Sequence, residues 1–409
     1  MSLNIKIKWK TLSEICDIAI SNVDKKSKKN QATVKLCNFT DVYNNWQISQ
    51  NDTKSFMSAT ASNNAINKFT LKEGQVAITK DSETRSDIGM STYIAENLDN
   101  TVLGYHCALL TPDPTVLDGG YLNAYLSSYL GRKYFSNQAS GSGQRYTLTL
   151  DSIGSVKIPI LDISYQKKLG KIFLNIDSKI SNSNAITKEL ESMAKTIYDY
   201  WFLQFEFPDK DGKPYKSNGG KMVWNDQLKQ EIPEGWEVAV INNILGKYPK
   251  TKTVESKNYN QGTKYPIIDQ SKDSYICGYT NDEEKVLKLS NAIVFGDHSN
   301  KSKYVNFPFA RGADGTQIIS SNNLRLPNYL LYQEIISLPE IEKGYSRHFK
   351  FLKMQNIIIP SLNISKKYMD LVDDMLNKQK QIILENKQLK SLRDFLLPLL
   401  MNGQVTIES

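Results

Sequence analysis

The sequence predicts an α+β protein with two mixed α/β domains, separated by two long helices that pair as an antiparallel coiled coil, with a pseudo-twofold internal repeat. Each half begins with a tryptophan-led strand, at Trp9 and Trp236, and closes on an apolar run ending in proline, at 156–159 and 357–360. A long segment with a seven-residue apolar repeat follows each run. The ends of these segments align at a constant offset, pairing Leu190 with Leu389, Ser192 with Ser391, Met193 with Leu392 and Ile197 with Leu396.

The repeat divides the 409 residues into five predicted parts. A chain of this length is sufficient for several domains with separate cores. The parts are a first globular domain at 1–161, a first long helix at 162–205, a linker at 206–233, a second globular domain at 234–361, and a second long helix with the C-terminal tail at 362–409.

Both globular domains combine short strands with one clear helix. β-rich runs bounded by Asn, Ser, Gly and Asp predict strands, and apolar residues at helical spacing predict helices. In the first domain the strands are at 33–39, 75–79 and 103–110, and the helix is at 120–131. In the second domain the strands are at 265–269, 292–296 and 317–320, and the helix is at 328–337.

The two long helices carry apolar seams that each need a partner. In the second helix, the residues spaced by seven are Tyr368, Met375, Ile382, Leu389 and Leu396, and the alternate seam holds Leu371, Leu392 and Leu399. In the first helix, one register holds Leu169, Ile176, Leu190 and Ile197, and the other holds Ile172, Ile180, Ile186, Met193 and Trp201. Such a repeat keeps one seam facing another helix, so we expect the two helices to pair with each other.

Polar residues interrupt both seams near the middle, at Ser183, Gln379 and Asn386. In an antiparallel pair the midpoints meet, so these side chains either face each other and fix the register or lie exposed. A helix of about 40 residues is about 60 Å long and acts as a spacer. The linker contains Pro208, Pro214 and paired glycines, which exclude a continuous helix and allow the chain to turn back.

Composition indicates a basic cytoplasmic protein. The net charge is +8, no run approaches the ~18 apolar residues of a membrane span, and the N-terminus lacks the apolar stretch of a secretory signal. Four scattered cysteines and three distant histidines indicate neither disulfides nor a metal site. Lysines crowd two loops in matching regions, which favours phosphate contacts over a merely solvated face; these are Lys25, Lys26, Lys28, Lys29, Lys247, Lys250, Lys252 and Lys257.

No catalytic motif is present. The sequence has neither a phosphate-binding glycine loop with its lysine nor a glycine fingerprint for a nucleotide-derived cofactor. Asp209 and Asp211 lie in the proline- and glycine-rich linker, without a strand to position them around a metal. We therefore expect a chain that is not an enzyme and that binds no metal or cofactor.

Four segments contain distinctive sequence motifs. These are Leu-Gln-Phe-Glu-Phe-Pro-Asp at 203–209, Ser-Asn-Gly-Gly-Lys-Met-Val-Trp-Asn at 217–225, Ile-Pro-Glu-Gly-Trp at 232–236, and Leu-Leu-Pro-Leu-Leu-Met-Asn-Gly at 396–403. With the duplicated plan, the chain resembles the specificity (S) subunit of type I restriction-modification enzymes over essentially its whole length.

The resemblance implies a DNA sequence-specificity subunit. The two globular units would be target-recognition domains, each reading one half of a bipartite site in double-stranded DNA. The coiled coil would set the spacer and dock two modification (methyltransferase) subunits that carry S-adenosylmethionine and methylate adenine at N6. Separate restriction subunits would carry ATP-driven translocation and cleavage, so ATP and Mg are also expected on partners. Two alternatives stay open: a DNA-independent coiled-coil scaffold, and the recognition part of a single-chain methyltransferase-nuclease.

The strongest candidate DNA contacts lie in two loops that precede the closing strands. In the first loop, glycines allow close approach to the DNA, while a glutamine and an arginine can bond adenine and guanine edges. Its residues are Gly141, Ser142, Gly143, Gln144, Arg145 and Tyr146, and the counterparts in the second domain are Ser346, Arg347, His348 and Lys350.

A second pair of loops follows the middle strands, and its lysines and serines suit phosphates. The candidates are Lys80, Ser82 and Arg85 in the first domain and His298, Lys301, Lys303 and Arg311 in the second, together with the loop lysines Lys28, Lys29 and Lys252. Asp81 and Asp297 either accept from cytosine N4 or cap a turn. The tryptophans Trp9 and Trp236 are expected to be core anchors.

The helix ends carry more apolar surface than a two-helix seam can bury. This surplus predicts a subunit-docking face, unless the globular domains cover it. The candidates are Tyr200, Trp201, Phe202, Phe395, Leu399 and Leu400.

Overall fold

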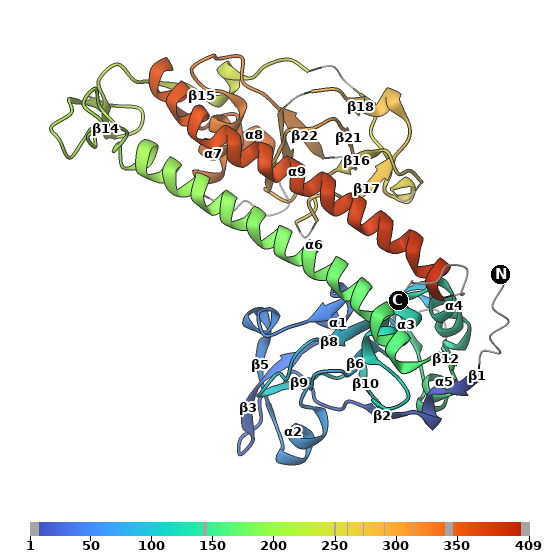
Figure 1. Ribbon diagram of the computed structural model, residues 1–409. Coiled ribbons are helices and arrows are strands. Elements are labelled where there is room, and N and C mark those ends of the chain that lie inside the picture. Colours follow the sequence, from blue (N-terminus) through green and yellow to red (C-terminus); the bar gives the residue numbers. More distant parts are fainter. Residues whose placement is uncertain are drawn as a thin grey trace. The chain divides into compact units, whose positions relative to one another are not determined.

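The computed structural model describes residues 8–141, 145–248, 251–259, 261–272, 274–289, 291–313, 315–339 and 347–401. The chain divides into two compact units (Figure 1). Each unit has its own hydrophobic core. Unit 1 consists of Met1–Ser183 and Glu385–Ser409, and unit 2 consists of Asn184–Leu384. The division falls inside the long helices, so each globular domain forms one compact unit with the adjoining halves of both helices.

Unit 1 opens with a short strand and ends with the strand that leads into the first long helix. Its strands are β1 (Lys8–Thr11), β2 (Cys16–Ile20), β3 (Ala32–Cys37), β4 (Gln47–Ile48), β5 (Met57–Ala61), β6 (Val76–Thr79), β7 (Asp81–Ser82), β8 (Ser91–Ile94), β9 (Thr101–Leu103), β10 (Cys107–Pro112), β11 (Tyr146–Thr147) and β12 (Lys157–Ile160). Its helices before the first long helix are α1 (Phe39–Asn44), α2 (Asn63–Phe69), α3 (Gly119–Ser127), α4 (Tyr129–Gln138) and α5 (Leu150–Gly154), with 3₁₀ turns at Leu12–Glu14, Asp52–Ser55 and Arg85–Asp87.

A five-stranded sheet in the order β2-β10-β6-β8-β4 forms the centre of unit 1. Its middle strands are buried on both faces, because alternate side chains enter two different cores. Val76 and Ile78 of β6 pack into the core that contains α3 and α4, whereas Ala77 packs into the core beside the three-stranded sheet β5-β3-β9. Because β6 packs into a core on each face, it fixes the position of the loop that follows it.

Two predicted elements of unit 1 are interrupted. The strand expected at 103–110 breaks at His106, whose φ of +74° ends β9 and starts β10 in a new direction. The helix expected at 120–131 breaks at Ser128, whose hydroxyl donates to the Tyr125 carbonyl and accepts from the Gly131 N–H. Ser128 therefore ends α3 and caps α4, because it satisfies groups of both helices.

Unit 2 repeats the plan with different details. Its strands are β13 (Met222–Asn225), β14 (Gln230–Pro233), β15 (Glu237–Val240), β16 (Tyr265–Ile268), β17 (Gly278–Thr280), β18 (Val286–Leu287), β19 (Ala292–Gly296), β20 (Ser302–Val305), β21 (Phe309–Arg311), β22 (Thr316–Ile319) and β23 (Asn356–Ile359). Its short helices are α7 (Asn328–Ser337) and α8 (His348–Leu352), with 3₁₀ turns at Ile241–Ile244, Ser256–Asn258 and Glu283–Lys285.

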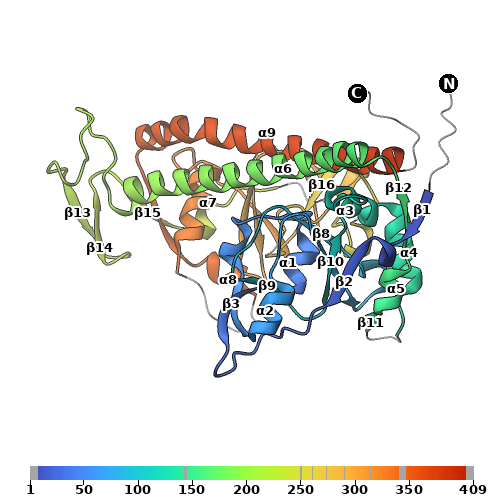
Figure 2. The same cartoon turned by 60° about the horizontal axis from the view of Figure 1, so that its bottom comes forward.

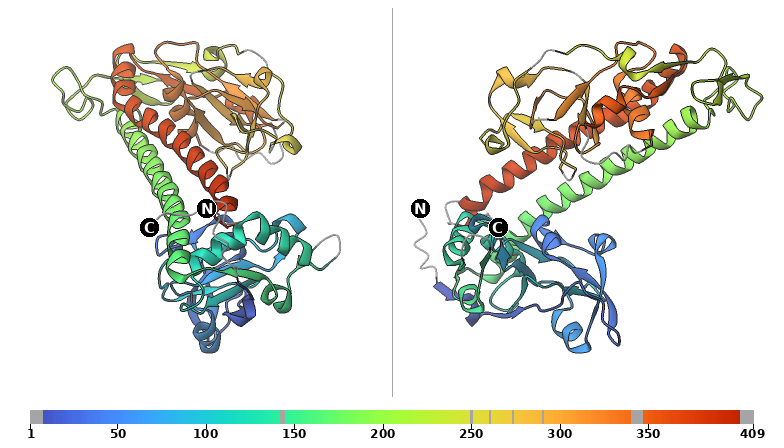
Figure 3. Two further views of the ribbon diagram at one scale, coloured as in Figure 1. Left: turned by 45° about the vertical axis from the view of Figure 1, so that its right-hand side comes forward. Right: turned by 180° about the vertical axis from the view of Figure 1, so that it is seen from behind.

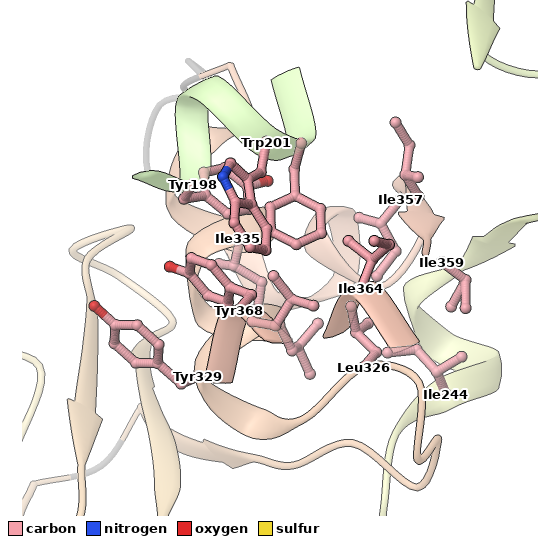
Figure 4. Packing of buried hydrophobic residues seen from close by; sticks show 14 of the residues in the cluster. Tyr198, Trp201, Ile244, Leu326, Tyr329, Ile335, Ile357, Ile359, Ile364 and Tyr368 are labelled. Carbon is pink, nitrogen blue, oxygen red and sulfur yellow. The ribbon is translucent and has the colours of Figure 1, made fainter. Parts of the chain in front are cut away.

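The sheets of unit 2 are smaller than those of unit 1. Strand β19 is the centre of a three-stranded sheet, β20-β19-β22, and a four-stranded sheet has the order β17-β16-β21-β18. Ile293 and Phe295 of β19 enter a large core that also contains α7, whereas Ala292 and Val294 enter a second core. Figure 4 shows the large core, where Tyr198 and Trp201 pack near Tyr368.

The internal repeat is confirmed by the strand pair that closes each unit. β1 pairs antiparallel with β12, and β15 pairs antiparallel with β23. The tryptophans differ, however. Trp236 is only 7% exposed, but Trp9 is 51% exposed. Trp9 is therefore not the core anchor that the sequence predicts.

The long helices are α6 (Ile163–Tyr198), extended by a π-helical turn at Asp199–Leu203, and α9 (Leu362–Met401). Within each unit their segments lie side by side (Figure 2). In unit 1, Lys179 of α6 forms an ion pair with Glu385 of α9 at 2.8 Å. In unit 2, the Tyr368 hydroxyl donates to the Ala194 carbonyl at 3.2 Å. The first half of one helix thus meets the second half of the other, which confirms antiparallel pairing.

The buried stripe departs from a strict seven-residue repeat. Tyr368 and Ile382 are buried as predicted, but Leu371 and Leu392 are exposed, and on α6 Ile186 and Met193 are exposed. The α-helix has 3.6 residues per turn, so a strict heptad drifts off the contact face. The actual α9 stripe in unit 2 is Tyr368, Val372, Leu376 and Ile382.

The polar interruptions lie inside the seams. Ser183 and Asn386 are buried in unit 1, and in unit 2 Gln379 Nε2 donates to the Thr187 carbonyl at 3.3 Å. The interpretation that these side chains are merely exposed is therefore wrong. The linker also contains structure that the sequence does not predict, since β13 and β14 form a hairpin after the end of α6 (Figure 3).

Candidate nucleic-acid interface

Two loops of unit 1 meet where the central strand β6 ends. Short strand β7 pairs with β11, and this pairing sets Asp81 opposite Thr147 and Ser82 opposite Tyr146. Gly141 begins the return turn with a φ of +131°, and a Cβ there would lie 2.2 Å from the Arg145 carbonyl oxygen. Only glycine fits this turn. The predicted residues Ser142, Gly143 and Gln144 lie outside the described residues.

Asp81 is the centre of a charged cluster. Its Oδ2 lies 2.6 Å from His106 Nδ1, 2.9 Å from Lys80 Nζ and 3.3 Å from an Arg145 terminal nitrogen. Burial acts to raise the pKa of Asp81, but hydrogen bonds from Thr147, His106 and Lys80 outweigh it and hold the pKa at about 2. The carboxylate is therefore ionised throughout the physiological range. Its acceptors are already used, so it anchors neighbouring groups instead of reading a base.

His106 Nδ1 contacts both Asp81 and Arg145. One ring nitrogen carries at most one hydrogen, so it cannot donate to Asp81 and accept from the arginine at the same time. Because Asp81 is ionised, the bond from His106 to Asp81 is the stronger of the two. Arg145 is thus held chiefly by its ion pair with Asp81, at 3.3 Å.

Arg145 remains available to a ligand. Its side chain is 57% exposed. Among the described residues, only one of its terminal nitrogens has hydrogen-bond partners. The remaining N–H groups keep the planar donor arrangement that matches guanine or phosphate acceptors.

The cluster borders an open cavity of about 450 Å³. Phe39 and Tyr43 stack at 5.8 Å and form an aromatic wall. The complete lining is Phe39, Tyr43, Asp81, Ser82, Glu83, Asp87, His106 and Arg145. The cavity therefore presents cationic, acidic and aromatic groups together.

The other DNA contacts predicted in unit 1 are of two kinds. Some side chains bond within the protein, and others are exposed. The Lys80 side chain is only 13% exposed and bonds Asp81, so it braces the cluster instead of reaching a phosphate. Arg85 is exposed and its guanidinium lies 5.1 Å from the Tyr146 ring centre. Ser82 accepts from the Thr84 N–H. The loop lysines Lys28 and Lys29 are exposed.

In unit 2, Asp297 directly follows central strand β19, as Asp81 follows β6. Its carboxylate accepts from the Phe349 N–H at 2.9 Å, and its carbonyl accepts from the His348 N–H at 2.9 Å. The predicted His348 is buried and its Nδ1 lies 3.0 Å from the same carbonyl, so it supports the loop from inside. Arg347 stands exposed immediately before α8. Ser346 lies outside the described residues.

The remaining DNA contacts predicted in unit 2 are of the same two kinds, bonded within the protein or exposed. Lys303 bonds the carbonyls of Asp269 and Ser274, and burial lowers the pKa of its ammonium. Arg311 donates to the carbonyls of Thr316 and Thr251. Both side chains therefore hold loops together, and a phosphate role is not supported for either. The exposed candidates are His298, Lys301, Lys350 and Lys252.

Lys350 also lines the second cavity, of about 340 Å³, with Lys353, Asn242, Asn243, Val240 and Met354. Unlike the cavity of unit 1, it has no acidic lining residue. Its two lysines and two amides give it a positive, phosphate-compatible character.

The predicted docking residues are only partly available. Trp201 and Phe202 are buried in the large core of unit 2, and Leu400 is buried in a core of unit 1. A side chain in a core cannot offer docking surface, so the candidate face is revised to exclude these three. Tyr200 and Phe395 are exposed, and Leu399 is partly exposed.

The sequence did not single out His106 or Glu83 as parts of the site. His106 reaches the site only through tertiary contacts. Glu83 is an acidic residue of an exposed loop, and no local sequence pattern distinguishes it. Within the described ranges no group of His, Cys, Asp and Glu could hold a metal ion. Asp209 of the linker instead accepts from the backbone N–H groups of Asp211 and Lys213. In the described part of the chain, none of the helices combines the length and the apolar composition that a membrane span requires.

Comparison with known proteins agrees with this duplicated architecture. Residues 4–192 match the family described as the type I restriction modification DNA specificity domain. The chain is also 28% identical over 317 residues to the type I restriction enzyme MjaIX specificity subunit of Methanocaldococcus jannaschii, over 71% of this chain and 70% of that protein. The chain is thus similar to type I restriction-modification specificity subunits, and its residues 4–192 carry the match to the DNA specificity domain.

Two further comparisons extend beyond the matched domain. The putative type I restriction enzyme MjaX specificity subunit of M. jannaschii is 25% identical over 340 residues, covering 75% of this chain and 72% of that protein. The crystal structure of a type I restriction-modification S subunit from M. genitalium superposes with a TM-score of 0.53 at 14% identity, over 97% of both chains. The likeness to this S subunit concerns the fold, and it includes the second half of the chain.

Proposed function

We propose that this chain is the DNA sequence-specificity subunit of a type I restriction-modification complex, in which each unit reads one half of a bipartite site. One recurring observation carries the proposal. In each unit an aspartate at the end of the central strand anchors a loop that exposes an arginine, Arg145 beside Asp81 and Arg347 beside Asp297. Exposed arginines on anchored loops are suited to contacts with base edges and phosphates.

Charge and exposed basic residues support DNA as the ligand. The chain has a net charge of +8, and lysines such as Lys28 and Lys252 are exposed. Lysines of this kind contribute affinity that falls with salt, whereas the arginines contribute sequence preference.

Methylome comparison tests the function directly. Single-molecule sequencing of genomic N6-methyladenine is carried out in a strain that has the complete system and in the same strain lacking only this chain. We expect a two-part motif with a fixed spacer that disappears in the deletion strain and returns with the wild-type gene. Identical methylation patterns in the two strains would reject the proposal.

The two long helices are proposed to set the spacer of the site. Helix α6 passes from unit 1 into unit 2 after Ser183, and α9 returns after Leu384. Insertion of four residues at both places lengthens each helix by about 6 Å. We expect a longer spacer between unchanged half-sites in the methylome. An unchanged spacer would disprove this role.

Helix α6 and the π-helical turn that extends it also carry a candidate docking face for modification subunits. Ile186, Met193 and Tyr200 are exposed and spaced by seven residues, which is the spacing that a partner helix recognises. We expect Met193→Glu to abolish copurification of modification subunits. The control is Lys188→Glu, an exposed polar site on the same helix, which should retain the complex.

The chemistry is proposed to reside on the partners. Modification subunits would supply S-adenosylmethionine, and restriction subunits would supply ATP and Mg, in the cytoplasm. The purified chain alone should then transfer no methyl group to DNA. Methyl transfer by the chain alone would instead support the alternative of a single-chain enzyme.

A further inference from the structure

The cavity of unit 1 carries two opposite charges that do not neutralise each other. Arg145 and Glu83 both line it, yet no ion pair joins them. Among the described residues Glu83 has no hydrogen-bond or ion-pair partner, and Arg145 keeps most of its N–H groups unused. A ligand that offers acceptors to one residue and a donor to the other would satisfy both.

The other acidic residues of the cavity are already engaged. Asp81 anchors His106, Lys80 and Arg145. Asp87 lies beside Tyr43, and burial together with this neighbouring carboxylate raises the pKa of the Tyr43 phenol. Glu83 is therefore the carboxylate that remains for a ligand.

The acidic lining disfavours a phosphate as the ligand of this cavity. A phosphate beside Arg145 would also face the carboxylates of Glu83 and Asp87, and this repulsion opposes binding. A base edge carries no net charge, and it can place amino donors against carboxylates. The cavity therefore matches the major-groove edge of a base pair better than it matches the DNA backbone.

We propose that the cavity of unit 1 reads a G·C base pair, with Arg145 donating to guanine O6 and N7 and Glu83 accepting from cytosine N4. This inference rests on the proposed function, and it specifies one base pair of the half-site that unit 1 reads. A G·C pair is the base pair that presents two guanine acceptors next to a cytosine amino donor in the major groove. Asp81 acts as a positioning residue, because it holds one terminal nitrogen of Arg145, and the other donors have no partner among the described residues.

The test begins from the wild-type motif obtained by N6-methyladenine sequencing. Duplexes with each base pair of the motif replaced in turn are then bound to the complete complex, and the change in affinity gives the discrimination at each position. Arg145→Ala and Glu83→Ala should each lose about tenfold to hundredfold discrimination, and at the same G·C pair. All other positions should keep their wild-type discrimination.

Arg85→Ala is the matched control, since Arg85 is an exposed arginine of the adjoining loop. It should weaken binding evenly across sequences and reduce the slope of log affinity against log salt by about one. Asp81→Asn should reduce discrimination at the Arg145 position more than overall affinity, because a misplaced arginine still contributes its charge. A purely structural role of Asp81 would lower assembly and affinity at all sequences equally.

Several outcomes would overturn the inference while leaving the proposed function intact. These are unchanged discrimination in Arg145→Ala or Glu83→Ala, relaxation at an A·T pair or at two different pairs, and an even, salt-dependent loss in Arg145→Ala like that of Arg85→Ala. A thermal melt and copurification of partner subunits show that each variant folds and assembles. If the wild-type complex itself shows no sequence preference, the proposed function fails instead.

Discussion

The two units share one order of elements but differ at the tryptophan-led strand with which each repeat begins. In unit 2, Trp236 packs against Phe202, Phe205 and Phe207, with ring centres 5.1 to 5.8 Å away. In unit 1, the corresponding Trp9 is half exposed. The aromatic side chains that cover Trp236 come from the end of α6 and the segment after it. The same strand pair is thus a core element in one unit and a surface ribbon in the other.

The reading loops differ in a similar way. Asp297 fixes its loop through backbone N–H and side-chain contacts at the start of α8, whereas Asp81 holds its loop through the side chains of His106 and Arg145. Backbone anchoring contributes mainly to stability. Side-chain anchoring contributes mainly to the position of Arg145, so equivalent aspartates should give different phenotypes.

The largest expected contrast concerns the two tryptophans. Trp236→Ala removes a buried aromatic side chain and should lower the free energy of unfolding by about 3–5 kcal/mol. Trp9→Ala removes a half-exposed side chain and should cost about 1 kcal/mol or less. Chemical denaturation of both variants gives the two values. Equal losses would show that Trp9 is a core residue and would remove this difference between the units.

A second contrast concerns helices α3 and α7. Leu126 lies five residues after buried Tyr121, and Glu334 lies five residues after buried Tyr329. Burial raises the pKa of Glu334 to about 7. Unit 2 thus buries a carboxyl group where unit 1 buries a leucine.

Glu334→Gln should therefore stabilise the protein in a pH-dependent manner. Below pH 4.5 the carboxyl is protonated in both states and carries no ionisation penalty. Between about pH 4.5 and 7 the unfolded chain releases a proton that the folded chain keeps, so the free energy of unfolding decreases, by about 3 kcal/mol in total. The variant should thus exceed the wild type at pH 8 and match it near pH 4.5.

Denaturation curves at the two pH values, with exposed Glu283→Gln as the control, measure this gain. The control should show no comparable gain at pH 8. A Glu334→Gln variant that is less stable than the wild type at pH 8 would mean that the ionised carboxylate is well compensated in the fold.

The reading loops provide the third contrast. Asp297→Ala leaves the Phe349 N–H without its acceptor and should cost about 1–2 kcal/mol. Asp297→Asn keeps an acceptor oxygen and should recover part of this loss. Arg145→Ala, in the exposed loop of unit 1, should change stability by about 0.5 kcal/mol or less. A large loss in Arg145→Ala would make this arginine a structural brace.

Much of this architecture is predictable from the sequence, because buried strands and amphipathic helices have local patterns. The predictions at 292–296 and 328–337 coincide with β19 and α7. The interruption at His106 has no local pattern, because its left-handed backbone is supported from a distance, where its carbonyl accepts from the Lys80 N–H at 2.8 Å. The hairpin β13–β14 was obscured by the glycines and prolines around it.

The candidate site was predictable only as a set of loops. Glycine and arginine at 141–145 indicate a DNA-contacting turn, but residue type does not tell whether a side chain points outward. Lys303 and Arg311 carry a positive charge, as Arg145 does, yet each bonds nearby carbonyls. The Asp81–His106–Arg145 cluster joins residues up to 64 positions apart, which only the tertiary fold brings together.

The smallest expected effect compares the two helix seams. In unit 1, Lys179 and Glu385 form an ion pair whose side chains are both substantially exposed, whereas the seam of unit 2 contains buried Tyr198 and Tyr368. Solvent and salt screen an exposed pair, so Lys179→Ala should cost no more than about 0.5 kcal/mol, and less at high salt. Denaturation of Lys179→Ala, Glu385→Ala and the double variant at two salt concentrations isolates the coupling between the charges. A coupling above 1 kcal/mol would mean that unit 1 relies on charge where unit 2 relies on aromatic packing.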